Sequence, residues 1–442
     1  MTKTFKHGGI HPADNKISAE SAIEPVAPEG AVRIFLSQHI GAPATPVVAK
    51  GDRVKVGQLI AKAAGFVSAN IHSSVSGTVA GIEPVADHLG IKKEAITINV
   101  EDDEWMEDID RSSSIVKDIR LTAGEILKKI TDAGLVGLGG AAFPSHVKLS
   151  PPPGKKAEFL IINAAECEPY LTSDYRVMME HPEELMTGIQ ILMKAVDVST
   201  AYLGIEVNKP KAIEKLNSLI CEYDGIKIVP LKKKYPQGGE KQLIKAITGR
   251  ETPSGGLPVD VGAIVHNVGT AFAVYEAVQK NKPLIDNIVT VTGKNIPVGK
   301  NLLVRVGTPA SKLLEIVGGM PDNTGKVIFG GPMMGKAASN PDAPTQKSVS
   351  AILLMPGEES HRGKPSACIR CSRCVSVCPM NLEPYLLKKL AEYKMYDESE
   401  KNSAHDCIEC GSCAYSCPAN IPLLDYIRLS KTEVLKMKRN RK

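Results

Sequence analysis

Two runs of cysteines near the C-terminal end have the spacing of ligands to iron–sulfur clusters. In each run three cysteines are separated by two residues, and a fourth follows after three residues, directly before a proline. Three thiolates at this spacing hold one face of a cubane, and the fourth cysteine ligates the other cluster. The sequence therefore predicts two [4Fe–4S] clusters. Cluster one is assigned to Cys368, Cys371, Cys374 and Cys417, and cluster two to Cys407, Cys410, Cys413 and Cys378.

A pair of zinc sites is the alternative for these eight cysteines. Zinc is normally held by separate pairs of cysteines and not by a run of four, so the spacing favours iron–sulfur. Cys167 and Cys221 stand alone in the sequence. We expect both to be small buried hydrophobic side chains, because free cysteine is among the most buried residue types.

Three further motifs, a turn after a predicted helix and two segments after predicted strands, could carry chemistry. A glycine-rich turn occupies residues 137–148 and ends on Lys148, the segment 163–170 reads NAAECEPY, and the segment 235–244 opens a helix at its glycine pair. Asn267 is a fourth candidate. Each motif alone is more readily explained as structural. Ligands of open α/β sheets bind at the carboxyl ends of the strands, so the three motifs together predict a nucleotide-like ligand there.

The elements that position these motifs alternate between strand and helix from about residue 121. Buried apolar runs at 158–163, 200–206 and 226–232 predict strands, and amphipathic segments at 182–196 and 239–249 predict helices. Such alternation is typical of a parallel, doubly wound sheet. We therefore expect an α/β ligand-binding domain over 120–282.

The remaining segments predict three smaller domains. Residues 47–82 have short β-branched runs divided by glycines, typical of a small β-sandwich like a lipoyl or biotinyl carrier domain, placed in 1–110. Its hairpin tip lacks the lysine that carries a prosthetic group, so we expect a structural or docking module. Strands alternate with one helix in the next domain, which predicts a β-grasp fold at 283–340. Apolar residues at helical spacing around the cysteine motifs predict an α-helical ferredoxin domain over 358–442.

Composition is that of an ordinary globular protein. Hydrophobic residues make up 43% of the chain and charged residues 23%, with a net charge of +5 that does not indicate nucleic-acid binding. No apolar run approaches the roughly 20 residues of a membrane span, and the first residues lack the apolar stretch of a signal peptide. We expect a cytosolic protein, or one held at a membrane by another component.

Several of these segments together resemble a known family. The segments 5–18 (FKHGGIHPADNKIS) and 41–48 (GAPATPVV), with the paired cysteine motifs, resemble the C subunits of the membrane-bound Rnf ferredoxin:NAD⁺ oxidoreductase complexes. The resemblance extends over nearly the whole chain. The α/β and β-grasp (SLBB-like) domains are also similar to the flavin subunit of respiratory complex I.

The resemblance to the flavin subunit implies cofactor-binding residues at matching positions. The FMN phosphate and ribityl chain would be held by Gly137, Gly139, Gly140 and Lys148. The flavin would be lined by Asn163, Glu166 and Tyr235, with Asn267 and Thr270 completing the site. The nicotinamide nucleotide would face Phe143, Glu168 and Glu240, the last two acting in catalysis.

The chain departs from the flavin-subunit pattern at several of these positions. An arginine is replaced by Leu138, an aspartate by Ala165 and a glutamate by Gly239, and Pro151 stands where an aromatic residue would stack on adenine. The loop 247–258 is also shorter. We expect FMN binding to persist and contacts to adenine to be weakened.

The function implied by the resemblance is conversion between two-electron hydride transfer and single-electron transfer. Hydride would pass between NAD(H) and the flavin, and single electrons would pass between the flavin and the clusters. Membrane subunits would couple this electron flow to movement of Na⁺ or H⁺. Ferredoxin would react elsewhere in the complex. The chain would lie at the cytoplasmic face of the membrane as a peripheral protein. A cobalamin reductase-like flavin protein and an electron relay without flavin are the two alternatives.

Overall fold

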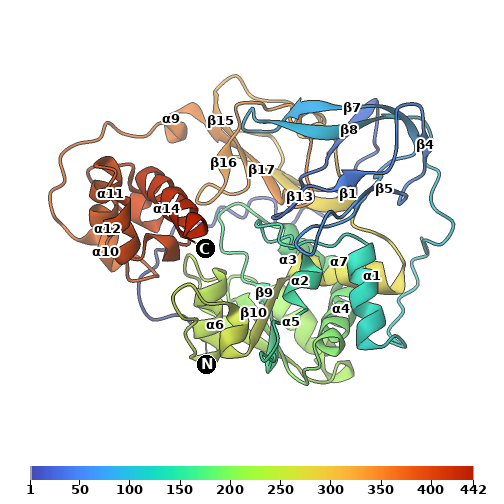
Figure 1. Cartoon of the computed structure of the whole chain (residues 1–442), viewed down its shortest axis with the longest axis horizontal. Helices are drawn as coiled ribbons and strands as arrows, with labels where there is room; N and C mark the ends of the chain where they lie inside the picture. The colour runs from blue at the N-terminus through green and yellow to red at the C-terminus, as the bar shows by residue number, and fades with distance from the viewer. Residues whose placement is uncertain (1, 442) are drawn as a thin grey trace.

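The computed structural model describes residues 2–441, which form four β-sheets and a group of C-terminal helices. Figure 1 shows the chain passing from the β-rich N-terminal part through an α/β domain and a second β-rich part to the helical C-terminal part. No helix among the described residues is both long enough and apolar enough to cross a membrane.

The α/β domain is built on a four-stranded parallel sheet in the order β11-β10-β9-β12. Its strands are β9 (Phe159–Ala164), β10 (Ala201–Glu206), β11 (Ile226–Leu231) and β12 (Ala263–Asn267). One face is covered by α1 (Ala123–Asp132), α3 (Ser173–Glu180), α4 (Pro182–Ala195), α5 (Pro210–Leu219) and α7 (Val268–Gln279), and the other by α6 (Glu240–Thr248). The predicted parallel sheet with helices on both faces is confirmed.

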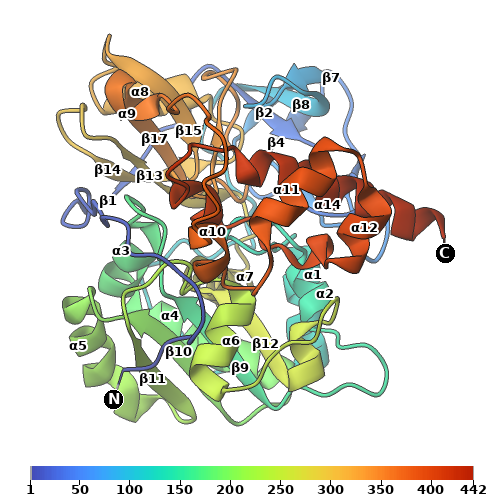
Figure 2. The ribbon, with the colours of Figure 1, turned by 90° about the vertical axis from the view of Figure 1, so that its left-hand side faces the viewer.

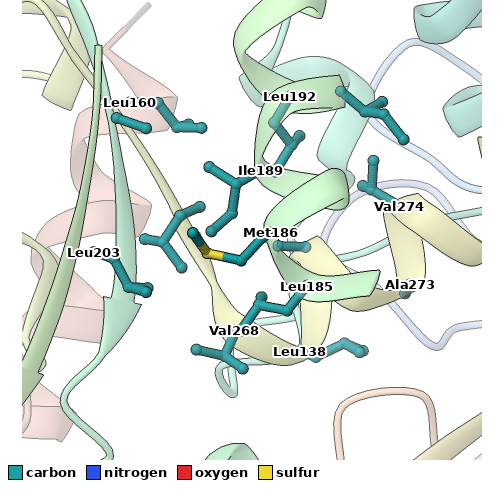
Figure 3. Close-up of a cluster of buried hydrophobic side chains, with 14 of the residues drawn as sticks. Leu138, Leu160, Leu185, Met186, Ile189, Leu192, Leu203, Val268, Ala273 and Val274 are labelled. Atoms are coloured by element: carbon teal, nitrogen blue, oxygen red, sulfur yellow. The ribbon is translucent and has the colours of Figure 1, made fainter. Parts of the chain in front are cut away.

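The main core lies between this sheet and the pair α4 and α7. Figure 3 shows Met186 and Ile189 of α4 pointing toward Leu203 of the sheet, with Val268 of α7 beside them. The two helices approach closely because α4 has a glycine at the crossing: a Cβ at Gly188 would lie 2.0 Å from the carbonyl oxygen of Ala271.

Two small sheets, β2-β8-β7-β4 and β3-β5-β6, make the N-terminal sandwich around a core of valine and isoleucine side chains. The strands are β2 (Ala31–Phe35), β3 (Thr45–Pro46), β4 (Arg53–Val54), β5 (Leu59–Lys62), β6 (Ile71–His72), β7 (Gly77–Ala86) and β8 (Lys92–Val100). The loop around Phe66, which corresponds to the hairpin tip of a carrier domain, contacts the α/β domain. The Phe66 carbonyl oxygen lies 2.9 Å from Nε2 of His146 in α2 (Ser145–Lys148).

A mixed six-stranded sheet, in the order β1-β14-β13-β17-β15-β16, forms the second β-rich part. Its members are β1 (Ile23–Pro25), β13 (Asp286–Thr292), β14 (Lys300–Arg305), β15 (Thr324–Phe329), β16 (Lys336–Ala337) and β17 (Ala351–Pro356), with α8 (Ala310–Ile316) beside them. The sheet is larger than the range 283–340 expected from sequence. It takes in β17, whose Ile352 and Leu354 complete the same core, and β1 from the N-terminal region, which pairs with β14.

The C-terminal part follows α9 (Gly357–Ser360), and within residues 361–441 every regular element is a helix. These are α10 (Arg373–Ser376), α11 (Pro384–Glu392), α12 (Tyr396–Lys401), α13 (Ser412–Tyr415), α14 (Leu423–Asn440) and a 3₁₀ turn at Ala404–Asp406. The helices expected between and after the cysteine motifs are therefore present as α11, α12 and α14.

An extended N-terminal segment, residues 3–18, ties the C-terminal helices to the α/β domain. Lys3 pairs with Leu231, and Ile10 pairs with Tyr235. Between these points the amide of Gly9 donates to the carbonyl of Val377, 2.8 Å away. Figure 2 shows the segment in dark blue, passing near α10 on its way to β1. We call residues 3–18 the N-terminal strap.

The close crossing of α4 and α7 makes Gly188 sensitive to any side chain. We expect Gly188→Ala to lower the free energy of unfolding by about 1–3 kcal/mol, because the added methyl group must push the helices apart. Gly124→Ala in α1 is the matched control, since a Cβ there meets nothing within 4 Å. Calorimetric unfolding of both variants tests the packing, and equal stability of the two would contradict it.

Candidate functional site

Asparagines at the carboxyl ends of β9 and β12 form the centre of the candidate site. Asn163 and Asn267 are register partners on these neighbouring strands. The Asn163 amide donates to the carbonyl of Gly238 at 2.8 Å, and Oδ1 of Asn267 caps α7 by accepting from the amide of Thr270 at 3.3 Å. Two of the predicted strand-end motifs therefore meet at this edge, together with Asn267.

The glycine-rich turn lies against the same edge. The Gly137 amide donates to the carbonyl of Phe143 at 2.9 Å, which closes the turn. The Leu138 amide donates to Oγ1 of Thr270 at 2.9 Å, so the turn is attached to the start of α7. The side chain of Leu138 is buried, and it extends the core where the flavin-subunit pattern has an arginine.

Two amides of this turn are available to a ligand. A Cβ at Gly139 would lie 3.3 Å from Cβ of Asn267, a tight contact that would require Asn267 to shift. Across residues 2–441 the exposed amides of Gly139 and Gly140 donate to no protein acceptor. Backbone amides without partners can bind phosphate oxygens, so the turn fits the phosphate end of FMN.

Lys148 and Glu240 form an ion pair that connects the turn region with the start of α6. Nζ of Lys148 lies 2.8 Å from Oε1 of Glu240 and 3.2 Å from the carbonyl oxygen of Val265 near the end of β12. Both side chains are partly exposed, at 31% and 39%. An incoming anion would compete with Glu240 for this ammonium group.

A buried group of charges beneath the site could not be recognised from the sequence. Nζ of Lys16, from the N-terminal strap, donates to the carbonyls of Glu166, Glu168 and Leu171 at 2.8, 2.9 and 2.6 Å. Lys209 likewise donates to the Ala165 carbonyl at 2.6 Å. Both lysines hold the loop after β9 in place. Neither lysine was identified as a site residue, because each lies far in sequence from the loop that it contacts.

Two carboxyl groups complete this buried group. Oε1 of Glu166 accepts from the Asp174 amide at 2.7 Å, and Oδ2 of Asp174 accepts from Nδ2 of Asn267 at 2.6 Å. Burial raises the pKa of Asp174 to about 7, and the nearby Glu166 contributes to this increase. Oε2 of Glu166 makes no hydrogen bond to any residue that the structure describes, and its ion pair with Lys16 is long, at 3.9 Å.

Glu168 lies close to Tyr235, where burial and then the charge of Glu168 raise the pKa of the hydroxyl, but its own carboxylate is bound by a different loop. Its carboxylate accepts from the amides of Met333 and Met334 at 3.2 and 2.7 Å, and a Cβ at Gly331 would lie 2.2 Å from Oε2. Burial raises the pKa of Glu168 to about 7. The side chain therefore holds the loop after β15. Its predicted role in nucleotide binding stays a prediction.

Tyr235 connects the candidate flavin site to the predicted cluster two. Its hydroxyl donates to the carbonyl of Cys410 at 2.8 Å, and its backbone pairs with Ile10 of the strap. Cys167 packs beside it, with the thiol accepting from the Gly238 amide at 3.3 Å. The expectation of a buried side chain is wrong for Cys221, which is exposed because it sits in the surface turn after α5.

Seven of the eight C-terminal cysteines fall into two spatial groups. Burial raises the pKa of Cys413, and the neighbouring thiols of Cys410, Cys407 and Cys378 raise it further. These four cysteines line one small apolar cavity. Burial also raises the pKa of Cys374, with further increases from Cys417 and Cys368. In each group a cysteine of one motif lies beside cysteines of the other, which fits two cubanes with crossed ligation.

The two groups differ in exposure. Cys378, Cys410 and Cys413 are buried, whereas Cys368 and Cys371 are exposed. Among residues 2–441, no three His, Cys, Asp or Glu side chains converge closely enough to hold a single metal ion. The group that contains Cys410 and Cys413, called the inner group, contacts the α/β domain through Tyr235. The group that contains Cys368, called the outer group, faces the surface.

The raised pKa of Asp174 predicts a pH dependence of stability. The folded pKa of about 7 exceeds the ordinary value of 3.8, so ionisation disfavours the folded state and the free energy of unfolding falls as pH rises between these values. We expect Asp174→Asn to flatten this fall. Thermal unfolding at about pH 5 and about pH 8 measures it. Asp132→Asn, at an exposed ion pair, is the control, and equal pH profiles for wild type and Asp174→Asn would contradict the assignment.

Three families of known domains match the chain. Residues 3–104 match the RnfC barrel sandwich hybrid domain, residues 130–276 the Nuo51 FMN-binding domain, and residues 361–419 a 4Fe–4S dicluster domain. An NAD⁺-reducing [NiFe]-hydrogenase structure is similar over 71% of this chain and 63% of that chain, with a TM-score of 0.50 and 18% identity. This last similarity concerns the fold alone.

Full-length relatives are much closer in sequence. The chain is 48% identical to the C subunit of the proton-translocating ferredoxin:NAD⁺ oxidoreductase complex of Clostridium ljungdahlii, covering 90% of this chain and 87% of the relative. It is 42% identical to the Na⁺-translocating counterpart of Acetobacterium woodii, covering 99% of this chain and 98% of the relative. The chain belongs to the family of C subunits of Rnf-type ion-translocating ferredoxin:NAD⁺ oxidoreductase complexes.

Proposed function

We propose that this chain is the NAD(H)-reactive, FMN-containing and iron–sulfur subunit of an ion-translocating ferredoxin:NAD⁺ oxidoreductase. The relatives and the three matched domains support this function. When bound, FMN supplies an exchange between hydride and single electrons, which an iron–sulfur cluster cannot make alone. Other subunits of the complex couple the electron flow to movement of Na⁺ or H⁺.

The FMN site proposed here uses the carboxyl edge of β9 and β12. The amides of Gly139 and Gly140 bind the phosphate, with Gly137 closing the turn and Lys148 neutralising charge. Asn163 lies beneath the flavin. Asn267 and Thr270 hold the glycine-rich turn and the start of α7 in position. Glu166 acts indirectly: it binds the amide of Asp174, and the Asp174 carboxylate binds the side chain of Asn267.

The hydrogen bond between Tyr235 and Cys410 supports the proposed order of the redox sites along the electron path. A tyrosine assigned to the flavin site touches the backbone of a cluster-two ligand at 2.8 Å. The side chain of Ile408, which follows the cluster-two ligand Cys407 in sequence, would lie 3.5 Å from a Cβ at Gly239. Cluster two therefore exchanges electrons with the flavin, and cluster one, whose ligands include exposed cysteines, leads to the surface.

NAD(H) is proposed to approach the flavin from the side of Phe143 and Glu240. Glu240 stands at the first turn of α6, where its carboxylate can accept hydrogen bonds from ribose hydroxyls. Glu168 contributes indirectly, by holding the Met333 loop against the site. The absence of an aromatic side chain at Pro151 supports weak discrimination on the adenine side.

The finer domain assignments belong to the same proposal. The sandwich is a lipoyl-like domain without its prosthetic group, the six-stranded sheet is an SLBB-like β-grasp domain, and the C-terminal helices are an α-helical ferredoxin. As a peripheral component, the chain sits at the cytoplasmic face of the membrane, where NAD(H) is available. The cobalamin reductase-like alternative is not favoured, because the family match includes the RnfC sandwich and the strap.

Anaerobic titration with NADH tests the function. We expect NADH to bleach the flavin absorbance and to generate cluster signals in electron paramagnetic resonance. In Cys417→Ala the signal of cluster one should be damaged while flavin bleaching and the cluster-two signal persist, because Cys417 ligates the cluster of the other motif. Loss of the cluster held by Cys407, Cys410 and Cys413 in this variant would show that ligation is not crossed. No flavin in the purified chain would favour the relay alternative.

Charge reversal at Lys148 tests the phosphate site. We expect Lys148→Glu to weaken FMN binding at least tenfold, because a carboxylate replaces the ammonium and joins Glu240 nearby. The neutral variant Lys148→Gln should have a smaller effect. Lys215→Glu, an equal charge change on exposed α5, is the matched control. FMN content and affinity are measured by flavin fluorescence, and iron content should stay constant. Unchanged affinity in Lys148→Glu would place the phosphate elsewhere.

A further inference from the structure

An exposed apolar patch surrounds the ligands of cluster one. Ile369 lies between two of these cysteines and is 68% exposed, and Tyr415, two residues before Cys417, is 60% exposed. Tyr385 is 45% exposed, and its backbone lies within hydrogen-bonding reach of the Cys374 thiol. Large apolar side chains at such exposure around one site mark an interaction surface more often than a solvated one.

Positive charge accompanies this patch. The segment 361–382 contains Arg362, Lys364, Arg370 and Arg373 and no Asp or Glu. Arg362 pairs with Asp425, whereas the other three cations make no ion pair within residues 2–441. Arg370 and Arg373 flank the cluster-one cysteines in sequence and are exposed. The acidic residue nearest to this segment in sequence is Glu383, which directly follows it and lies beside Tyr385. Exposed apolar side chains and exposed cations without ion pairs among residues 2–441 therefore occur together around the cluster-one cysteines.

We infer that this face, defined by Ile369, Arg370, Arg373, Tyr385 and Tyr415 and called the outlet face, binds an acidic protein that carries one electron at a time. The inference rests on the proposed function, because it needs cluster one to be the outer end of the electron path. Charge complementarity selects the partner, since unpaired arginines attract a surface rich in Asp and Glu. Electron-transfer contacts are small and short-lived, which suits a compact patch of this kind.

Electron transfer across this face would change only the oxidation states of the cluster and the carrier. Reduced cluster one loses one electron, and the oxidised carrier gains one. No bond is made or broken and no proton has to move. The exposed position of Cys368 and Cys371 leaves the cluster near the surface, where a carrier can approach it. The arginines supply orientation and encounter rate, and the apolar side chains exclude water from the contact.

Direct electron transfer to an acidic carrier tests the outlet face. The full chain with both clusters is reduced with dithionite, freed of excess reductant and mixed with an oxidised plant-type [2Fe–2S] ferredoxin, an acidic protein. We expect the rate and the binding affinity to fall as ionic strength rises. Arg370→Glu/Arg373→Glu should reduce both at least tenfold at low salt and remove most of the salt dependence.

Three controls make the result specific. Lys50→Glu/Lys62→Glu changes the charge equally on the sandwich domain, at exposed lysines without ion pairs in residues 2–441, and should behave as wild type. Iron content and cluster spectra should be equal in all variants. Oxidation by p-benzoquinone, a small neutral acceptor, should be unaffected. Reduction by dithionite bypasses NADH and flavin, so failure of the proposed NADH reaction would leave this test valid.

Two outcomes would overturn the inference. Equal ferredoxin affinity and rate in the Arg370→Glu/Arg373→Glu variant and wild type would show that the carrier does not use this face. Binding to phosphatidylglycerol vesicles that depends on these two arginines, without any effect on the ferredoxin reaction, would instead assign the face to an anionic membrane surface.

Discussion

The contact between Tyr235 and Cys410 is the interaction on which the arrangement of the redox sites depends. It is one hydrogen bond of 2.8 Å, but it joins the α/β domain to the innermost cysteine group. The N-terminal strap holds both sides of it, pairing with Tyr235 through Ile10 and with the helical part through Gly9. Electron transfer requires the two sites to be close and fixed. The strap, which lies within the matched RnfC domain, therefore holds the two sites together.

Buried charge is the second constraint, and it lies directly beneath the candidate flavin site. Lys16 and Lys209 satisfy backbone carbonyls of the loop after β9, while Glu166 and Asp174 link that loop to α3 and α7. Burying ionised groups is unfavourable unless they are paired and hydrogen-bonded. These partners come together only in the correctly folded loop, so the group favours one conformation of the loop, although Oε2 of Glu166 has no hydrogen-bond partner among residues 2–441.

Much of the architecture could be predicted from the sequence, because local pattern decides it. Alternating apolar strands and amphipathic helices identified the parallel sheet, and the strand-end asparagines were correctly expected at one edge. The position of Glu168 was not foreseeable, since its carboxylate is held by Met333 and Met334, which lie about 165 residues later in the chain. The extent of the six-stranded sheet was missed for the same reason, as β1 joins it from the N-terminal region.

The sequence by itself determined the chemistry of the cysteines. Their spacing is a covalent property of the chain, and it limits what metal group three neighbouring thiolates can hold. Only the tertiary structure decided how that chemistry is connected. It placed one cysteine group against Tyr235 and left the other at the surface, and it brought Lys16 under the flavin-site loop. These contacts depend on packing between segments distant in sequence, and such packing leaves no periodic or local pattern from which it could be read.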